Sequence, residues 1–177
     1  MRLKLFLLLV VAVACFAQSA NPEPDIADIF YLLDSTKLTP LERQSATFHG
    51  SAHGFIVMSM KSSSEFAGDR SPIRLKSGLP LEFVVRTIIP PAIVDPGTIY
   101  CLRKLNVKKK TRELVMMSGH VQPFGASTTV KPEEGSLPVE FSTYGSSSLK
   151  MLTKQLAPGE YVVGKFGGPA VFCFGID

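Results

Sequence analysis

Glycine and proline occur along the whole chain and limit the folds it can adopt. The 177 residues include 14 glycines and 13 prolines, which leave only short uninterrupted stretches between them. Most of these stretches are apolar or alternate between apolar and polar residues, as strands do, whereas helices show a period near 3.6 residues over longer runs. The sequence therefore predicts one all-β domain of many short strands joined by turns.

Individual segments support this prediction. Residues 81–86 largely alternate in polarity, which is typical of a half-buried strand, and residues 171–174 are apolar throughout, which predicts a central strand. Helix signals are few. Leu149, Leu152 and Leu156 have helical spacing, but an extended conformation competes with a helix over this segment.

We predict a single β-sandwich over residues 25–177, either Ig-like or jelly-roll-like, with a small barrel as the alternative, because both classes share short strands and Gly/Pro turns. Three segments are expected to be loops: the Ser-rich residues 61–70, the Pro-rich residues 90–96 and residues 119–136. The last segment is longer than most connections in a compact domain, so it is a candidate binding loop.

The first 17 residues have the pattern of a secretory signal peptide. Arg2 and Lys4 precede a long apolar run, and small residues stand one and three positions before a cleavage point after Ala17. We expect cleavage there, a short flexible leader over residues 18–24, and an exported protein that is periplasmic or extracellular. Since no second apolar run of about 18 residues follows, no transmembrane span is expected in the mature chain.

Cys15 leaves a second outcome open. Residues 12–15 partly resemble the lipobox of bacterial lipoproteins, in which the Cys is acylated and becomes the first mature residue, although Ala12 stands where that pattern has Leu. Acylation of Cys15 would anchor the protein to a membrane surface.

Two further cysteines, Cys101 and Cys173, follow the signal. An even number of cysteines in an exported protein permits one disulfide, and two buried apolar thiols on separate strands are the equal alternative. The spacing does not decide between these two possibilities. There is no CxxC motif to indicate a redox dithiol or a zinc site.

Three histidines are the only candidates for a metal site. His49 and His53 are four residues apart, which on a helix would place both imidazoles on one face, and His120 is a conceivable third ligand. Glycines beside His49 and His53 disfavour a helix, however, so a polar Gly-rich turn is the competing interpretation. No cofactor is predicted.

Residues 103–112 carry six cations. Their position between two apolar strands predicts the exposed tip of a hairpin. The functional alternative is an anion-binding patch made by Lys108, Lys109, Lys110 and Arg112, whose partner would be an anionic envelope component or a protein. Because no aromatic residues interleave with these cations, nucleic acid is not expected as a partner.

Several segments resemble one family. Residues 156–161 read LxPGEY and residues 174–177 read FGID, and residues 30–34 and 38–44 are also similar. These features resemble uncharacterised small secreted bacterial (Acidobacteria-like) β-sandwich proteins. The resemblance covers residues 25–46 and 71–177 and implies a fold and an exported location, but no activity, ligand or catalytic residue.

The sequence also lacks the GxSxG and phosphate-loop motifs of common enzyme classes. The leading hypothesis is therefore an exported, non-enzymatic binding or envelope-associated module. One alternative is a small secreted hydrolase or metal-dependent enzyme that uses His49, His53 or His120. Another is a structural component of an envelope assembly that docks through the long loop or an open sheet edge.

Overall fold

The computed structural model describes residues 22–54, 58–88, 93–121, 129–132, 135–165, 168 and 170–177. Strands account for nearly all of the regular structure: β1 (Phe30–Asp34), β2 (Lys37–Pro40), β3 (Glu42–Ser45), β4 (Thr47–His53), β5 (Met58–Ala67), β6 (Arg74–Leu75), β7 (Glu82–Arg86), β8 (Tyr100–Val107), β9 (Thr111–Val121), β10 (Thr129–Pro132), β11 (Val139–Tyr144), β12 (Ser148–Thr153), β13 (Gly159–Lys165) and β14 (Ala170–Ile176). A single-turn helix, α2 (Pro96–Ile99), leads into β8. The prediction of an all-β fold is confirmed. Within these described ranges, no helix is long and apolar enough to cross a membrane.

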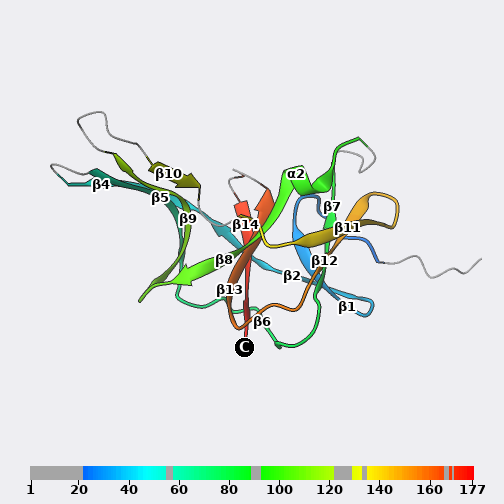
Figure 1. Cartoon of the computed structure of the whole chain (residues 1–177). Helices are drawn as coiled ribbons and strands as arrows, with labels where there is room; N and C mark the ends of the chain where they lie inside the picture. Colours follow the sequence, from blue (N-terminus) through cyan, green and yellow to red (C-terminus); the bar gives the residue numbers. More distant parts are fainter. Residues whose placement is uncertain are drawn as a thin grey trace, which may run out of the picture.

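The strands form two sheets. The five-stranded sheet has the order β11-β12-β7-β1-β2, and the nine-stranded sheet has the order β3-β14-β13-β8-β9-β5-β4, with β10 paired to β9 and β6 paired to β14. The two end strands of the larger sheet, β3 and β4, are separated in the chain by Ala46 alone. The larger sheet therefore curls back toward its own starting point and forms a half-barrel beside the smaller sheet (Figure 1).

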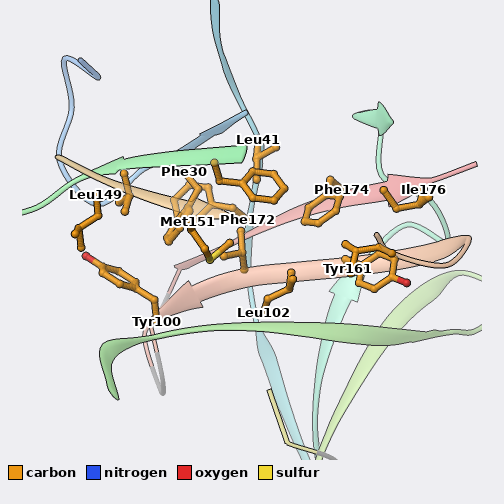
Figure 2. Close-up of a cluster of buried hydrophobic side chains, with 14 residues drawn as sticks. Phe30, Leu41, Tyr100, Leu102, Leu149, Met151, Tyr161, Phe172, Phe174 and Ile176 are labelled. Carbon is orange, nitrogen blue, oxygen red and sulfur yellow. The ribbon is translucent and has the colours of Figure 1, made fainter. Parts of the chain in front are cut away.

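The main core lies between the two sheets. Phe83 of the smaller sheet packs on Phe174 of the larger one with a distance of 5.0 Å between ring centroids, and Phe30 meets Tyr100 edge-on at 5.3 Å. Figure 2 shows Phe30, Tyr100 and Phe174 together with aliphatic residues from both sheets. Burial of this aromatic and aliphatic surface is the main stabilising contribution to the fold.

β13 and β14 are buried on both faces, as a central strand requires. Tyr161 and Phe174 point into the main core, whereas Val162 and Cys173 point to the other side, where they form a second cluster with Phe66 and Leu105. The prediction of a central strand over residues 171–174 is confirmed, because β14 lies between β13 and β3. This second cluster occupies the concave side of the half-barrel.

Three local expectations were wrong. The Ser-rich residues 61–70 are expected to be a loop, but most of them belong to β5. The expected loop over residues 119–136 contains the end of β9 and all of β10, and its residues 122–128 and 133–134 lie outside the described residues. Residues 47–53 form strand β4 rather than a turn. The segment at residues 149–156, for which helix and strand competed, begins with strand β12. Residues 89–92 of the expected Pro-rich loop lie outside the described residues.

The N-terminal segment is held against the smaller sheet. The Glu23 carboxylate accepts hydrogen bonds from the backbone N–H of Ser146, at 2.6 Å, and from the hydroxyls of Ser147 and Ser148. These hydrogen bonds, led by the one from the Ser146 backbone, lower the pKa of Glu23 to about 2. Glu23, expected in a flexible leader, is therefore clamped to the β11–β12 turn, whereas the expected signal peptide and Cys15 lie outside the described residues.

Candidate functional site

Part of the nine-stranded sheet projects away from the smaller sheet. We call strands β4, β5, β9 and β10 the arm, and Figure 1 shows them extending to the left of the molecule. In the arm, β4 pairs with β5 and β5 pairs with β9, both antiparallel. Because side chains alternate between the faces of a strand, this register defines two chemically different faces.

The inner face of the arm, which is continuous with the concave side of the half-barrel, is apolar. Cross-strand partners place Phe48 beside Ser64, and Ala52 beside Met60. Phe48 and Met60 have exposed fractions of 64% and 41%, although both are large apolar side chains. Exposed apolar side chains gathered on one sheet face indicate a surface that binds something.

A β-bulge adds two methionines to this face. Ser62 pairs with Met117, but the next residue, Ser63, pairs with Val115, so Met116 is the extra residue of β9. The bulge lets Met116 and Met117 face the same side, and both are more than one-third exposed. The Met116 sulfur also accepts a hydrogen bond from the Ser64 hydroxyl at 3.4 Å. Methionines make an apolar surface that adapts to different partners.

A pocket lies where the inner face meets the half-barrel. Its volume is about 80 Å³, and its lining is mostly apolar. The arm contributes Phe48, Leu114 and Met116. The body, by which we mean the smaller sheet and the remaining strands of the larger one, contributes Val162 and Val171 together with other residues of β8 and β13. Strand β3 pairs with β14, but after Ala46 the chain continues as β4, which pairs with β5 instead. The pocket lies at this seam, where β4 separates from β14.

Strand β4 forms the outer edge of the arm. Within the described residues, β4 pairs with β5 on one edge, and no strand pairs with its other edge. All seven of its residues, Thr47–His53, are exposed. The strand contains no Pro, Lys, Arg, Asp or Glu, the residues with which proteins commonly block strand edges. It therefore offers a row of backbone hydrogen-bonding groups to an added strand.

The outer face of the arm is polar and carries the three histidines. The register places His53, Ser59 and His120 in one row across three strands. The Ser59 hydroxyl and His120 Nδ1 are in hydrogen-bond contact at 3.1 Å. His49 lies apart from this pair and contacts Glu65 at 3.5 Å. The part of the chain that the structure describes contains no group of three or more His, Cys, Asp or Glu that could hold a metal ion, so the three histidines do not form the metal site considered above.

The cations of residues 103–112 are not one patch. The segment is a β8–β9 hairpin, as predicted, and Lys109 and Lys110 lie exposed in its turn. Lys108 donates to Glu65 at 2.6 Å and to Glu113 at 3.0 Å. Burial opposes ionisation of the Glu113 carboxyl, but hydrogen bonds from Lys61 and Lys108 outweigh it and hold the pKa of Glu113 at about 2. Because Lys108 is held by two carboxylates, only Lys109 and Lys110 of the expected four-residue anion site remain as exposed lysines in the turn.

Arg112 is completely buried, so its expected role as a contact to an external ligand was wrong. Its guanidinium makes two hydrogen bonds to Glu42, at 2.9 and 3.1 Å, and lies 3.6 Å from Glu160. Glu160 in turn pairs with Arg74, which crosses over Gly175, where any Cβ would collide with the guanidinium. Burial alone would lower the pKa of Arg112, but the hydrogen bonds to Glu42 raise it. Through Glu42 and Glu160, Arg112 connects β9 to β3 and β13.

Cys101 and Cys173 are both free thiols. Strand β13 lies between them: Cys173 pairs with Val162, whereas Cys101 pairs with Gly164. Strands two positions apart are separated by roughly 9–10 Å, which exceeds the separation of about 7 Å that a disulfide can bridge. Burial raises the pKa of Cys173 to about 12. The structure shows separate thiols on separate strands, of which Cys173 is buried, as that alternative expects, whereas Cys101 is only partly buried.

Comparisons of this chain with protein-family models, with curated proteins and with solved structures find no match. The site therefore stands on its geometry alone. The predicted candidates did not include Phe48, Met60, Met116 or Met117. One signal was present in the sequence, because residues 47–53 alternate between polar residues and apolar or small ones, which is the pattern of a strand with two different faces.

Proposed function

We propose that the protein is an exported, non-enzymatic binding module that receives an extended segment of a partner polypeptide at the open edge of β4. The observation that carries this proposal is the edge itself: an exposed seven-residue strand, paired on one side only, beside an apolar face and a pocket. Its export follows from the signal-like N-terminal sequence and is part of the proposal.

The backbone of β4 supports strand addition. An extended peptide that pairs with an open edge gains main-chain hydrogen bonds along its whole length, and these give affinity without depending on its sequence. The edge strand carries neither Pro nor a Lys, Arg, Asp or Glu side chain, so a new strand meets no steric block and no desolvated charge there.

Specificity would come from every second side chain of the added segment. These side chains would continue the inner face of the arm, next to Phe48 and Ala52. Ala52 is small, so it leaves room for a larger apolar residue of the partner between Phe48 and Met60. The chemistry that fits is a segment that alternates apolar and small polar residues.

The pocket at the seam would hold an anchor residue. A volume of about 80 Å³ suits one short apolar side chain, and the pocket is lined by Phe48, Val162 and Val171 among others. An apolar anchor in a desolvated pocket is the usual source of most of the binding energy at such an interface. The added segment would thus cover the pocket beside β4.

The test uses fluorescein-labelled synthetic peptides of about seven residues that alternate Val or Leu with Thr or Ser. Fluorescence anisotropy measures their binding to the mature chain, and amide hydrogen exchange maps the protected backbone. We expect saturable binding with new protection confined to β4. An Ala52→Lys variant places a charge on the inner face at the edge and is expected to weaken binding at least about tenfold.

Thr143→Lys is the matched control, because it adds the same charge at an exposed residue of β11, which belongs to the other sheet. It is expected to bind like the wild type, and thermal unfolding verifies that both variants are folded. The proposal fails if no peptide binds, if protection appears away from β4, or if the two lysine variants bind equally well.

A further inference from the structure

The outer face of the arm contains a polar hollow that the proposed function does not use. It has a volume of about 420 Å³ and lies over β4, β5 and β9. Hydroxyls, imidazoles and one ammonium group line it, and they belong to Ser51, Ser59, Ser118, His53, His120 and Lys61. Met60 and Gly119 also border the hollow. The register fixes this arrangement, since Ser51, Lys61 and Ser118 form the row next to that of His53, Ser59 and His120.

The hollow is rich in hydrogen-bond donors. None of the described residues that line it is acidic. Three hydroxyls, two imidazoles and an ammonium group, all able to donate hydrogen bonds, line this part of the outer face. Donors without a carboxylate among them suit an oxyanion, and hydrogen bonds between charged donors and anionic oxygens are the stronger kind.

The contact between Ser59 and His120 adapts the hollow to an anion. When the imidazole of His120 is protonated, Nδ1–H donates to the Ser59 oxygen across the 3.1 Å contact. The Ser59 proton is then free to donate to a bound ligand, and Nε2–H of His120 provides a second donor. Protonation would therefore add a positive charge and release one further donor.

Charged groups on every neighbouring strand set the surroundings of the hollow. Lys61 is bound at 2.8 Å to Glu113, which also holds Lys108, and His49 contacts Glu65 further along the arm. The register of β10 places Lys131 opposite Ser118. The two carboxylates are thus engaged by Lys61, Lys108 and His49, and they lie outside the hollow.

We propose that this hollow binds an oxyanion, a phosphate or sulfate group, free or carried on a larger ligand, through His53, His120 and the surrounding serine hydroxyls. This site and strand addition at β4 use different groups: the hollow uses side chains of the outer face, whereas strand addition uses the backbone edge of β4. The anion site expected at the hairpin residues 108–112 is thereby replaced by one on the arm.

The test titrates the mature chain with inorganic phosphate, inorganic sulfate and glycerol 1-phosphate, separately, and follows imidazole and amide NMR signals. We expect saturable shifts at His53, His120 and Ser59 with at least one of the three anions. Tighter binding of glycerol 1-phosphate than of phosphate indicates a phosphoester ligand. Preference for sulfate indicates a sulfated one, and equal binding of the two phosphates indicates free phosphate.

Variants make the test decisive. His53→Gln and His120→Gln are each expected to weaken binding about tenfold, the loss expected for one hydrogen bond to a charged group. His49→Gln is the control, because His49 lies outside the hollow, and it should bind like the wild type. The proposal is overturned if no anion gives saturable shifts, or if His49→Gln weakens binding as much as His53→Gln. Failure here leaves peptide binding at β4 unaffected, so the two proposals are tested separately.

Discussion

Two parts of the nine-stranded sheet differ in how far their strands are buried, although both are built by antiparallel strand pairing. In the body, β13 and β14 are buried on both faces, with aromatic residues on one side and Val162 and Cys173 on the other. In the arm, β4 is exposed along its full length, and apolar side chains such as Phe48 remain in contact with solvent. The comparison teaches that one continuous sheet can combine strands buried on both faces with an edge strand that is exposed along its whole length.

The largest difference is expected at Arg112. Replacing it with Ala leaves Glu42 and Glu160 without the buried cation that they share, which is expected to lower the free energy of unfolding by about 3–5 kcal/mol. Urea denaturation measures this change. Lys110→Ala in the same hairpin, where the side chain is exposed, is expected to change stability by less than about 0.5 kcal/mol. Equal effects of the two substitutions would mean that the buried contacts of Arg112 do not stabilise the protein.

Two methionines, one in the main core and one in the arm, compare the effect of the same substitution in the two parts of the molecule. Met151 is fully buried in the main core, so Met151→Ala is expected to destabilise the protein by about 2–5 kcal/mol. Met117 is 41% exposed on the inner face of the arm, so Met117→Ala is expected to alter stability by less than about 0.5 kcal/mol. Thermal unfolding measures both variants, and the anisotropy assay should show weaker peptide binding only for Met117→Ala. A strongly destabilised Met117→Ala would mean that Met117 stabilises the fold as a core residue does, despite its exposure.

The smallest effect concerns the Glu23 clamp. Its folded-state pKa, about 2, lies below the ordinary value of 4.5, so the ionised carboxylate stabilises the protein above pH 4.5. That contribution is lost as the pH falls from 4.5 toward 2. Glu23→Gln is expected to be less stable than the wild type by about 1 kcal/mol at neutral pH, a value reduced for the partial exposure of the clamp.

Urea denaturation of both proteins as a function of pH checks this expectation. The difference between them should vanish over the acidic window, and the common effect of Glu113 cancels because both proteins contain it. A difference that stays constant down to pH 2 would show that the clamp does not depend on the charge of Glu23.

The sequence predicted the body better than the arm, for physical reasons. In β14, residues 171–174 are apolar throughout, so local composition alone indicates a central strand. The Ser-rich strand β5 has little intrinsic preference for extended structure, and its pairing with β4 and β9 decides its conformation. The sequence does not distinguish the buried Arg112 from the exposed Lys109 and Lys110, because the residue that pairs with Arg112, Glu42, is distant in the chain. Pairings between distant segments are the information that a single sequence does not contain.

The continuity of β3 and β4 through Ala46 has a mechanical consequence. Tension applied along β4 by a bound partner would pass directly into β3, whose residues pair with β14 at four successive positions, from Ser45 opposite Ala170 to Glu42 opposite Cys173. Such a pull along the strand loads these hydrogen bonds together in shear rather than one after another, and Arg112 fastens the far end through Glu42. The arrangement suits a module that must hold its partner under load.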